Sequence, residues 1–152
     1  MKKFEFTGEF IVYFGKKLFR IKSLIDFGDV KRGEVGGFVE KEENLSQDGN
    51  AWVCGNALVY GDAMVYGNAW VYGNARVCGD ADYACVKGFG RACRNTTFFR
   101  TQDDGASVVC GCFHGTLQEF REKVKETHGE SKMAKEYLTI ADLMKMHFDK
   151  EA

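Results

Sequence analysis

The chain has 152 residues, with 21 Lys and Arg residues against 22 Asp and Glu residues. No run of about 18 uncharged apolar residues is present to cross a bilayer, and the formal net charge of −1 leaves no surplus of cations to neutralise a phosphate backbone. We therefore expect no membrane partner and no nucleic acid as the principal ligand. Because the chain contains 18 glycines and no proline, glycine has to form its turns.

The amino terminus lacks the pattern of a secretory signal. Met1, Lys2 and Lys3 supply a basic start, but Gly8 and Glu9 interrupt the apolar residues that follow. We therefore expect a cytoplasmic protein, in which the reducing environment keeps cysteines as free thiols. The cysteines concerned are Cys54, Cys78, Cys85, Cys93, Cys110 and Cys112.

Residues 1–43 alternate apolar and polar side chains in short stretches that are separated by Gly8, Gly15 and Gly28. This pattern predicts an antiparallel β-meander, because alternation places apolar side chains on one face of each strand. We expect the meander to cover the start of the segment that follows.

The central segment repeats every six residues. Glycine recurs from Gly49 to Gly79 with this spacing, each glycine is followed by Asn or Asp and then by Ala, and valine recurs in step from Val53 to Val77. A period of six fits neither an α-helix nor a coiled coil, and it predicts short strands with inward valines and glycine corners. Three units complete a coil of 18 residues, so that each residue stacks on the residue 18 positions further along.

The C-terminal third shows the pattern of two strands followed by two helices. We expect the strands at 96–101 and 106–114, joined by the tight-turn signal Asp104-Gly105. Thr116-Leu117-Gln118-Glu119 is a capping box that begins a first helix, and Ser131 is the expected N-cap of a second helix.

With its six-residue repeat, the chain resembles the hexapeptide-repeat family of left-handed parallel β-helix proteins. The resemblance implies a β-helix for the repeat, and together with the patterns on either side of it this predicts a mainly β fold with three domains. These are an N-terminal β-meander cap over residues 1–43, a short left-handed β-helix over 44–94 and a C-terminal ββαα module over 95–152. The left-handed sense follows from the resemblance alone.

A second resemblance covers nearly the whole chain. It rests on the repeat followed by Thr97-Phe98-Phe99-Arg100-Thr101 and Cys110-Gly111-Cys112-Phe113-His114-Gly115-Thr116-Leu117-Gln118-Glu119-Phe120. In this order of segments the chain is similar to small bacteriophage and prophage proteins that are labelled only as polymer-forming or hexapeptide-repeat proteins. The resemblance implies a phage accessory protein in the host cytoplasm, and it transfers no catalytic residue.

The 18-residue register places aromatic side chains above one another on the outside of the expected coil, with Trp52 beneath Trp70. An exposed aromatic face of this size needs a cover. Association into a homotrimer supplies one, and a planar ligand stacked on the face supplies another. The candidate interface or ligand residues are Trp52, Tyr60, Tyr66, Trp70, Tyr72, Arg76, Arg91, Arg94 and Arg100.

These features predict a non-enzymatic binding protein, for which we assign no catalytic residue, cofactor or metal ligand. The phage resemblance motivates the hypothesis that the protein inhibits a host antiviral defence, either by sequestering a small signalling nucleotide or by occluding a defence protein. A nucleotide base would stack on the aromatic face while arginine side chains hold its phosphates.

Two other functions stay open from the sequence. In hexapeptide-repeat acyltransferases a histidine serves as general base, and His114 is the residue that could reach the repeat of a neighbouring protomer. A structural or assembly role in the phage particle is the other. Cys110, Cys112 and His114 share one strand face, but they lack the turn that structural zinc sites usually have, so we interpret this face as buried.

Overall fold

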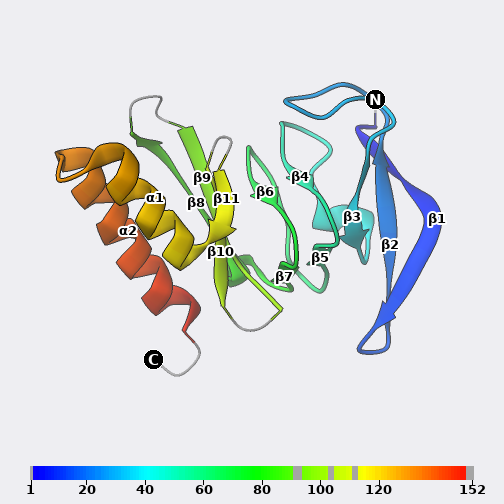
Figure 1. Cartoon of the computed structure of the whole chain (residues 1–152). Coiled ribbons are helices and arrows are strands. Elements are labelled where there is room, and N and C mark those ends of the chain that lie inside the picture. Colours follow the sequence, from blue (N-terminus) through cyan, green and yellow to red (C-terminus); the bar gives the residue numbers. More distant parts are fainter. Residues whose placement is uncertain (1, 91–93, 103–104, 111–112, 150–152) are drawn as a thin grey trace. The chain divides into compact units, whose positions relative to one another are not determined.

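The computed structural model describes residues 2–90, 94–102, 105–110 and 113–149. The chain divides into two compact units, Met1–Asp82 and Tyr83–Ala152, whose elements are labelled in Figure 1.

The first unit is built on a five-stranded mixed sheet in the order β1-β2-β3-β5-β7. Its strands are β1 (Phe4–Tyr13), β2 (Lys16–Ser23), β3 (Val35–Val39), β5 (Leu58–Val59) and β7 (Arg76–Val77). β1, β2 and β3 pair antiparallel, whereas β5 pairs in parallel with both β3 and β7. A separate parallel pair consists of β4 (Trp52–Val53) and β6 (Trp70–Val71), and short 3-10 helices cover Glu42–Asn44 and Asp80–Asp82.

The six-residue repeat packs its valines and alanines inside. The five repeat valines from Val53 to Val77 are fully buried, and the five alanines from Ala51 to Ala75 are at most 2 % exposed. Trp52 lies opposite Trp70, and Leu58 lies opposite Arg76, which is the expected register of 18 residues. The chain turns where glycine permits a positive φ, which lies between 64° and 72° at Gly49, Gly55, Gly61, Gly67 and Gly73.

The prediction of a mainly β fold is confirmed, but the prediction of a left-handed β-helix is wrong. In the described residues the strands divide among three sheets, and the repeat strands are only two residues long. On the third side of the repeat, Val65 pairs with Leu45, which precedes the repeat, and not with another repeat unit. The repeat is long enough for each of its strands to pair once with the strand 18 residues further along. β1, β2 and β3 extend the sheet formed by β5 and β7, and they do not cap a coil.

Two side chains that precede the repeat donate hydrogen bonds to backbone carbonyl groups in its first units. Lys3 Nζ donates a hydrogen bond to Ala51 O at 2.7 Å and lies 4.7 Å from the centre of the Phe27 ring. The fully buried Asn44 donates from Nδ2 to Ala63 O at 2.8 Å. These bonds take the place of the ladder that a further strand would supply.

Lys3 is expected to make the stability of the chain increase with pH. The side chain is 1 % exposed, and burial lowers the pKa of its amine from 10.5 to about 8. Between these values the unfolded chain binds a proton that the folded chain does not, so this group raises the free energy of unfolding with pH by up to about 3 kcal/mol. Urea unfolding at pH 8 and at 10.5 measures the rise as the difference between wild type and Lys3→Met. An identical pH dependence of the two proteins would contradict this role of Lys3.

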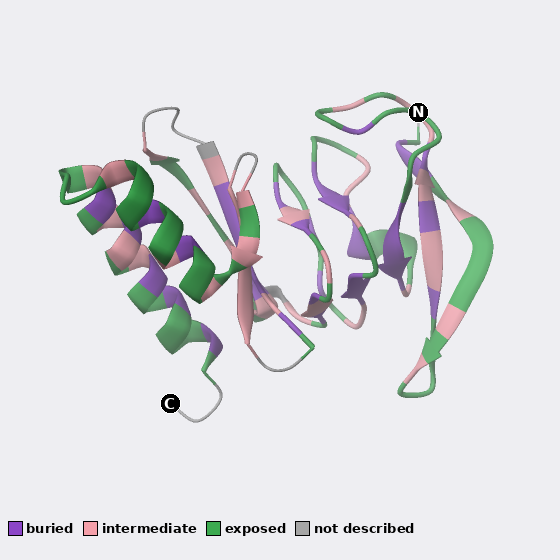
Figure 2. Cartoon of the chain, in the orientation of Figure 1, coloured by how far each residue is buried: buried purple, intermediate pink, exposed green. Residues whose placement is uncertain are grey.

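The second unit is a four-stranded antiparallel sheet with two helices on one face. The sheet has the order β11-β10-β9-β8. Its elements are β8 (Tyr83–Phe89), β9 (Arg94–Arg100), β10 (Ala106–Cys110), β11 (Phe113–Thr116), α1 (Leu117–His128) and α2 (Lys132–Phe148). Phe98 and Val108 of the sheet pack against Phe120, Tyr137 and Met144 of the helices. Figure 2 shows buried and exposed residues alternating along both helices, as amphipathic helices require.

The expected ββαα module is corrected to four strands and two helices. The segment that follows the repeat forms β8 and pairs with β9. The pairing of β8 with β9 therefore crosses the domain boundary that was expected between residues 94 and 95. The pairing of β3 with β5 likewise crosses the boundary expected between residues 43 and 44. Asp104 of the expected tight turn lies outside the described residues.

Both predicted helix starts are confirmed. Thr116 Oγ1 accepts a hydrogen bond from Glu119 N at 3.1 Å, and Glu119 Oε1 accepts one from Thr116 N at 2.9 Å. Ser131 Oγ accepts a hydrogen bond from Ala134 N at 3.2 Å. Neither helix, nor any other in the part of the chain that the structure describes, is long and apolar enough to cross a membrane.

Candidate functional site

The structure brings the two repeat tryptophans into register without exposing them as an open face. Trp52 is fully buried, and the Phe27 ring packs edge-on against it with ring centres 5.3 Å apart. Trp70 is half-buried and donates from Nε1 to Asn50 O at 3.2 Å. The same chain therefore supplies for Trp52 the cover that was expected from a second copy or a ligand.

The predicted tyrosines lie in different surroundings. Tyr66 and Tyr72 are exposed. Tyr60 is half-buried, and its ring packs edge-on against the Tyr13 ring at 5.6 Å. Burial, with a smaller contribution from Cys78, raises the pKa of Tyr60 to about 12, so this side chain is a neutral phenol at physiological pH.

The described arginines among the candidates are engaged within their own units. Arg76 lies 5.6 Å from the centre of the Tyr13 ring in the first unit. Arg100 donates to Phe148 O at 2.7 Å in the second unit. Arg91 and the side chain of Arg94 lie outside the described residues.

The prediction that Cys110, Cys112 and His114 share the face of one strand over 106–114 is wrong. Cys110 ends β10 and His114 lies on β11, and these two strands pair antiparallel. His114 is exposed on β11, and Cys112 lies outside the described residues. Cys110 is half-buried, and its Sγ accepts a hydrogen bond from Thr96 Oγ1 at 3.1 Å. Within the described ranges, no group of three or more His, Cys, Asp or Glu side chains is placed to hold a metal ion.

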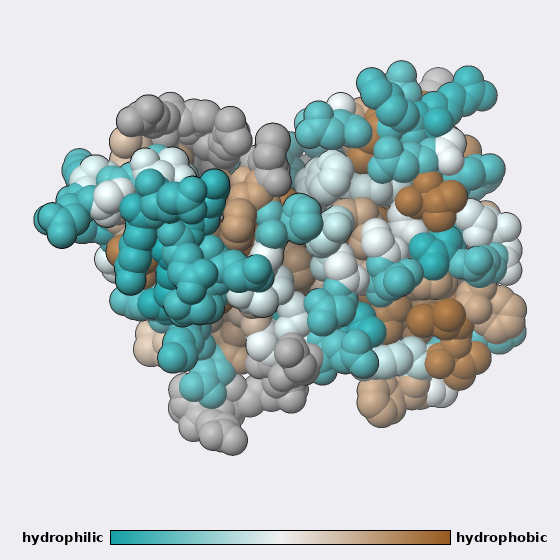
Figure 3. Space-filling view, viewed as in Figure 1, coloured by the Kyte–Doolittle hydropathy of each residue, from teal (hydrophilic) through white to brown (hydrophobic). Residues whose placement is uncertain are grey.

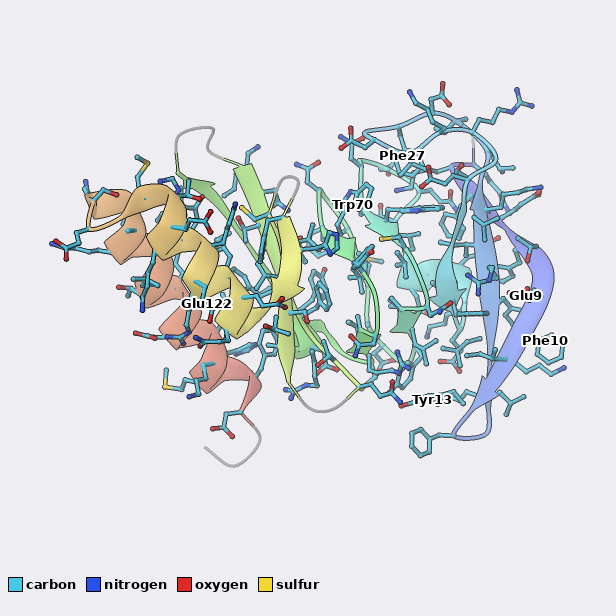
Figure 4. The ribbon with its side chains drawn as sticks, viewed as in Figure 1. Glu9, Phe10, Tyr13, Phe27, Trp70 and Glu122 are labelled. Carbon is cyan, nitrogen blue, oxygen red and sulfur yellow. The ribbon has the colours of Figure 1, made fainter. Side chains whose placement is uncertain are left out.

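The β1–β2 hairpin exposes apolar side chains on one of its two faces. Ile11 and Tyr13 pack against the core that includes Phe38. Phe10 and Val12 alternate with them along β1, so they point the other way, and they are 46 % and 63 % exposed. Figure 4 shows Phe10 and Tyr13 on opposite sides of β1, and Figure 2 shows how much of this strand is exposed.

The exposed face continues into a row of aromatic rings. The Phe10 ring lies 6.1 Å from the ring of Phe19, which in turn stacks on Phe6 at 4.9 Å. In Figure 3 apolar side chains gather over β1 and β2, at the right of the view. We call Phe10, Val12 and Phe14 the hairpin patch.

Phe14 sits at the tip of the hairpin in a conformation that bulky side chains rarely adopt. It forms a two-residue turn with Gly15, and φ is 50° and 79° at the two positions, the geometry of a type I′ turn, which favours Asn-Gly. The left-handed region costs a non-glycine residue about 1–2 kcal/mol, and Phe14 is the one non-glycine residue with positive φ in the described part of the chain. Its side chain is also 86 % exposed. The two-residue turn requires the positive φ, and the Phe14 ring packs edge-on against the Tyr13 ring with centres 4.6 Å apart. The choice of phenylalanine for this turn and its large exposure are what the hairpin does not require.

Positive charge flanks the hairpin patch. The segment from Phe10 to Phe19 contains Lys16 and Lys17 and no Asp or Glu. Lys17 Nζ lies 4.7 Å from the centre of the Phe10 ring, while Lys16 contacts Glu40 at 3.5 Å in an exposed pair of little strength. The patch thus presents apolar side chains together with cations.

The free edge of β1 is poorly shaped for the addition of another strand. β1 is the outer strand of its sheet, but its register with β2 shifts between Phe6 and Phe10. Gly8 lies in this irregular stretch with φ of 99°. A bulge interrupts the hydrogen-bond ladder and twists the edge, so side-chain contact through the patch is favoured over strand pairing.

The hairpin patch was not predicted from the sequence, because the alternating pattern of residues 1–43 indicated only a cap. One signal was present: Phe14 precedes Gly15 in a two-residue turn, where Asn or Gly is typical. Which face of β1 is exposed depends on packing against Phe38, which is distant in the chain. Local patterning does not contain that information.

Comparison with known proteins adds no family to this description. No protein-family model matches the chain, and no curated protein matches its sequence. The functional assignment accordingly depends on the hairpin patch.

Proposed function

We propose that this chain is a non-enzymatic binding protein that docks on a partner protein through the hairpin patch. The observation that carries the proposal is the exposure of Phe14, which is 86 %. Its positive φ is also a backbone conformation that phenylalanine rarely adopts. Binding energy in protein interfaces concentrates in a few residues, and aromatic side chains that fill pockets on the partner are prominent among them. Phe14 is well placed to be such an anchor.

The expected partner surface combines an apolar pocket with carboxylates. Phe14 enters the pocket with Phe10 and Val12 beside it, and Lys16 and Lys17 face the carboxylates. A standard interface buries about 800 Å² on each partner, which is more than three side chains supply. Polar residues around the hairpin patch therefore complete the contact.

The similarity to phage accessory proteins supports a host defence protein as this partner. Docking inhibits such a protein by covering a surface that it needs, and no catalytic group of this chain is required. Occlusion is favoured over nucleotide sequestration because Trp52 is covered by Phe27, and because Arg76 and Arg100 are engaged within their own units.

Phage plating on bacteria that carry different defence systems tests the proposal. Expression of the chain is expected to restore plating on at least one defended strain. Val12→Glu is expected to abolish this effect, since it places a carboxylate in the apolar contact and opposite the partner's acidic residues. Val35→Glu is the matched control, because Val35 on β3 is similarly exposed, at 52 %, and lies outside the hairpin patch.

Failure to relieve any defended strain would overturn the proposal. Equal loss of activity in Val12→Glu and Val35→Glu would remove the hairpin patch from it. Stoichiometric recovery of the chain in purified phage particles would replace inhibition with a structural role.

A further inference from the structure

The second unit contains a cavity of about 260 Å³ that opens to solvent between the sheet and α1. It is independent of the hairpin patch, which belongs to the first unit. The residues that matter for its chemistry are Phe113, Phe120, Lys123, Thr127, His128 and Tyr137.

Three aromatic rings form the walls of the cavity. Phe113 and Phe120 lie 6.0 Å apart between ring centres, and Tyr137 packs edge-on against Phe120 at 5.7 Å. Tyr137 is held in place by the hydrogen bond that its hydroxyl donates to Phe89 O at 3.0 Å. Rings held in this way can pack against a planar ligand with either their faces or their edges.

The polar side chains that line the cavity come from the last turns of α1, and Lys123 is the positively charged one among them. Lys123 and Thr127 are one helical turn apart and therefore lie on the same side of the helix. His128 follows them, and its ring stacks on Tyr137 at 5.9 Å. The described lining contains no carboxylate.

Lys123 is available to a ligand. Among the described residues, Lys123 forms an ion pair with Glu126 at 3.9 Å, and both side chains are more than half exposed, so that pair is weak. An anion bound in the cavity mouth would be less exposed to water than Glu126. Because charges attract more strongly where water is excluded, Lys123 is expected to pair with the bound anion in preference to Glu126.

The volume of the cavity limits the size of the guest. Pockets for drug-sized ligands hold about 300–1,000 Å³, so a cavity of about 260 Å³ suits one ring with one small substituent and is too small for a whole nucleotide. We propose that this cavity binds a single-ring aromatic anion, with the ring among Phe113, Phe120 and Tyr137 and the anionic group at Lys123 and His128.

Calorimetric titration of the full-length chain with benzoate tests this site. Benzoate is expected to bind, whereas benzyl alcohol, which has the ring without the charge, and acetate, which has the charge without the ring, are expected to bind at least about fivefold more weakly. Lys123→Gln is expected to weaken benzoate binding about threefold to fivefold. Lys125→Gln is the matched control, because Lys125 is an exposed lysine on the same helix outside the cavity lining.

A second variant tests the location of the site. Thr127 is exposed at the mouth, so Thr127→Trp fills the entrance without disturbing the core, and it is expected to abolish benzoate binding. Undetectable binding of benzoate by the wild type would overturn the proposal. So would equal effects of Lys123→Gln and Lys125→Gln, or full binding by Thr127→Trp. None of these results bears on the hairpin patch, whose activity is measured by plating.

Discussion

Replacing Gly36 with alanine is expected to lower the free energy of unfolding by about 3 kcal/mol or more. A Cβ at Gly36 would lie 2.6 Å from Val53 O, 2.7 Å from Trp52 Cζ2 and 2.9 Å from Ile21 Cγ1. These neighbours are a backbone carbonyl and two core side chains, none of which can swing away. The chain can accommodate the extra methyl group only by separating β3 from the repeat.

The neighbouring residue has the same constraint. A Cβ at Gly37 would lie 2.7 Å from Ala57 O and 2.8 Å from Val53 Cγ1, so the Gly36-Gly37 pair allows β3 to lie directly against the repeat. Because β3 joins the hairpin to β5, this contact links the two halves of the five-stranded sheet. Gly37→Ala is therefore expected to be destabilising as well.

Urea unfolding of the full chain measures the effect of Gly36→Ala. Gly79→Ala is the matched control, because a Cβ there meets nothing within 4 Å and its φ is not in the left-handed region. The control is expected to change stability by no more than about 0.5 kcal/mol. Similar stabilities of the two variants would show that the close approach of β3 to the repeat is not as described.

Replacing Phe14 with asparagine is expected to abolish docking while it stabilises the fold. Asparagine tolerates the left-handed region, and Asn-Gly is a preferred pair for a type I′ turn, so we expect the free energy of unfolding to rise by about 0.5–1 kcal/mol. The same change removes the most exposed aromatic side chain of the hairpin patch. Loss of partner binding with a gain in stability cannot be attributed to misfolding.

Phe14→Tyr is the control for this substitution. It keeps the aromatic ring and the backbone preference, so it is expected to retain protection of phage in the plating assay, with unchanged stability. Thermal unfolding and plating of the three proteins measure both effects. Full protection by Phe14→Asn would exclude Phe14 as the anchor and with it the observation on which the proposed function rests.

Opposite effects on stability and activity are typical of residues kept for binding. A sequence usually agrees with its fold at every level, and an exposed residue that violates a local preference points to a functional constraint. Phe14 is an unfavourable residue for a type I′ turn, and it is also an aromatic residue that is left exposed. Gly36, in contrast, is required by the close packing of β3 against the repeat.

Features that depend on neighbours in the chain were predictable from the sequence alone. The six-residue period placed Val53 and the other repeat valines inside and glycine at the corners, because a branched side chain and a positive φ impose local limits that hold in any fold. The capping residues Thr116 and Ser131 began their helices as expected, since a cap bonds to backbone groups two or three residues away.

Only the tertiary structure decided what covers each face and which strands share a sheet. Phe27 covers Trp52, β8 leaves the repeat to pair with β9, and β1 to β3 extend the sheet of β5 and β7. Each outcome depends on contacts between segments far apart in the chain, where many pairings satisfy the same alternating pattern. The prediction of a left-handed β-helix was wrong for this reason. The exposure of Phe14 could not be predicted either, because periodicity gives the spacing of side chains and not the identity of their partners.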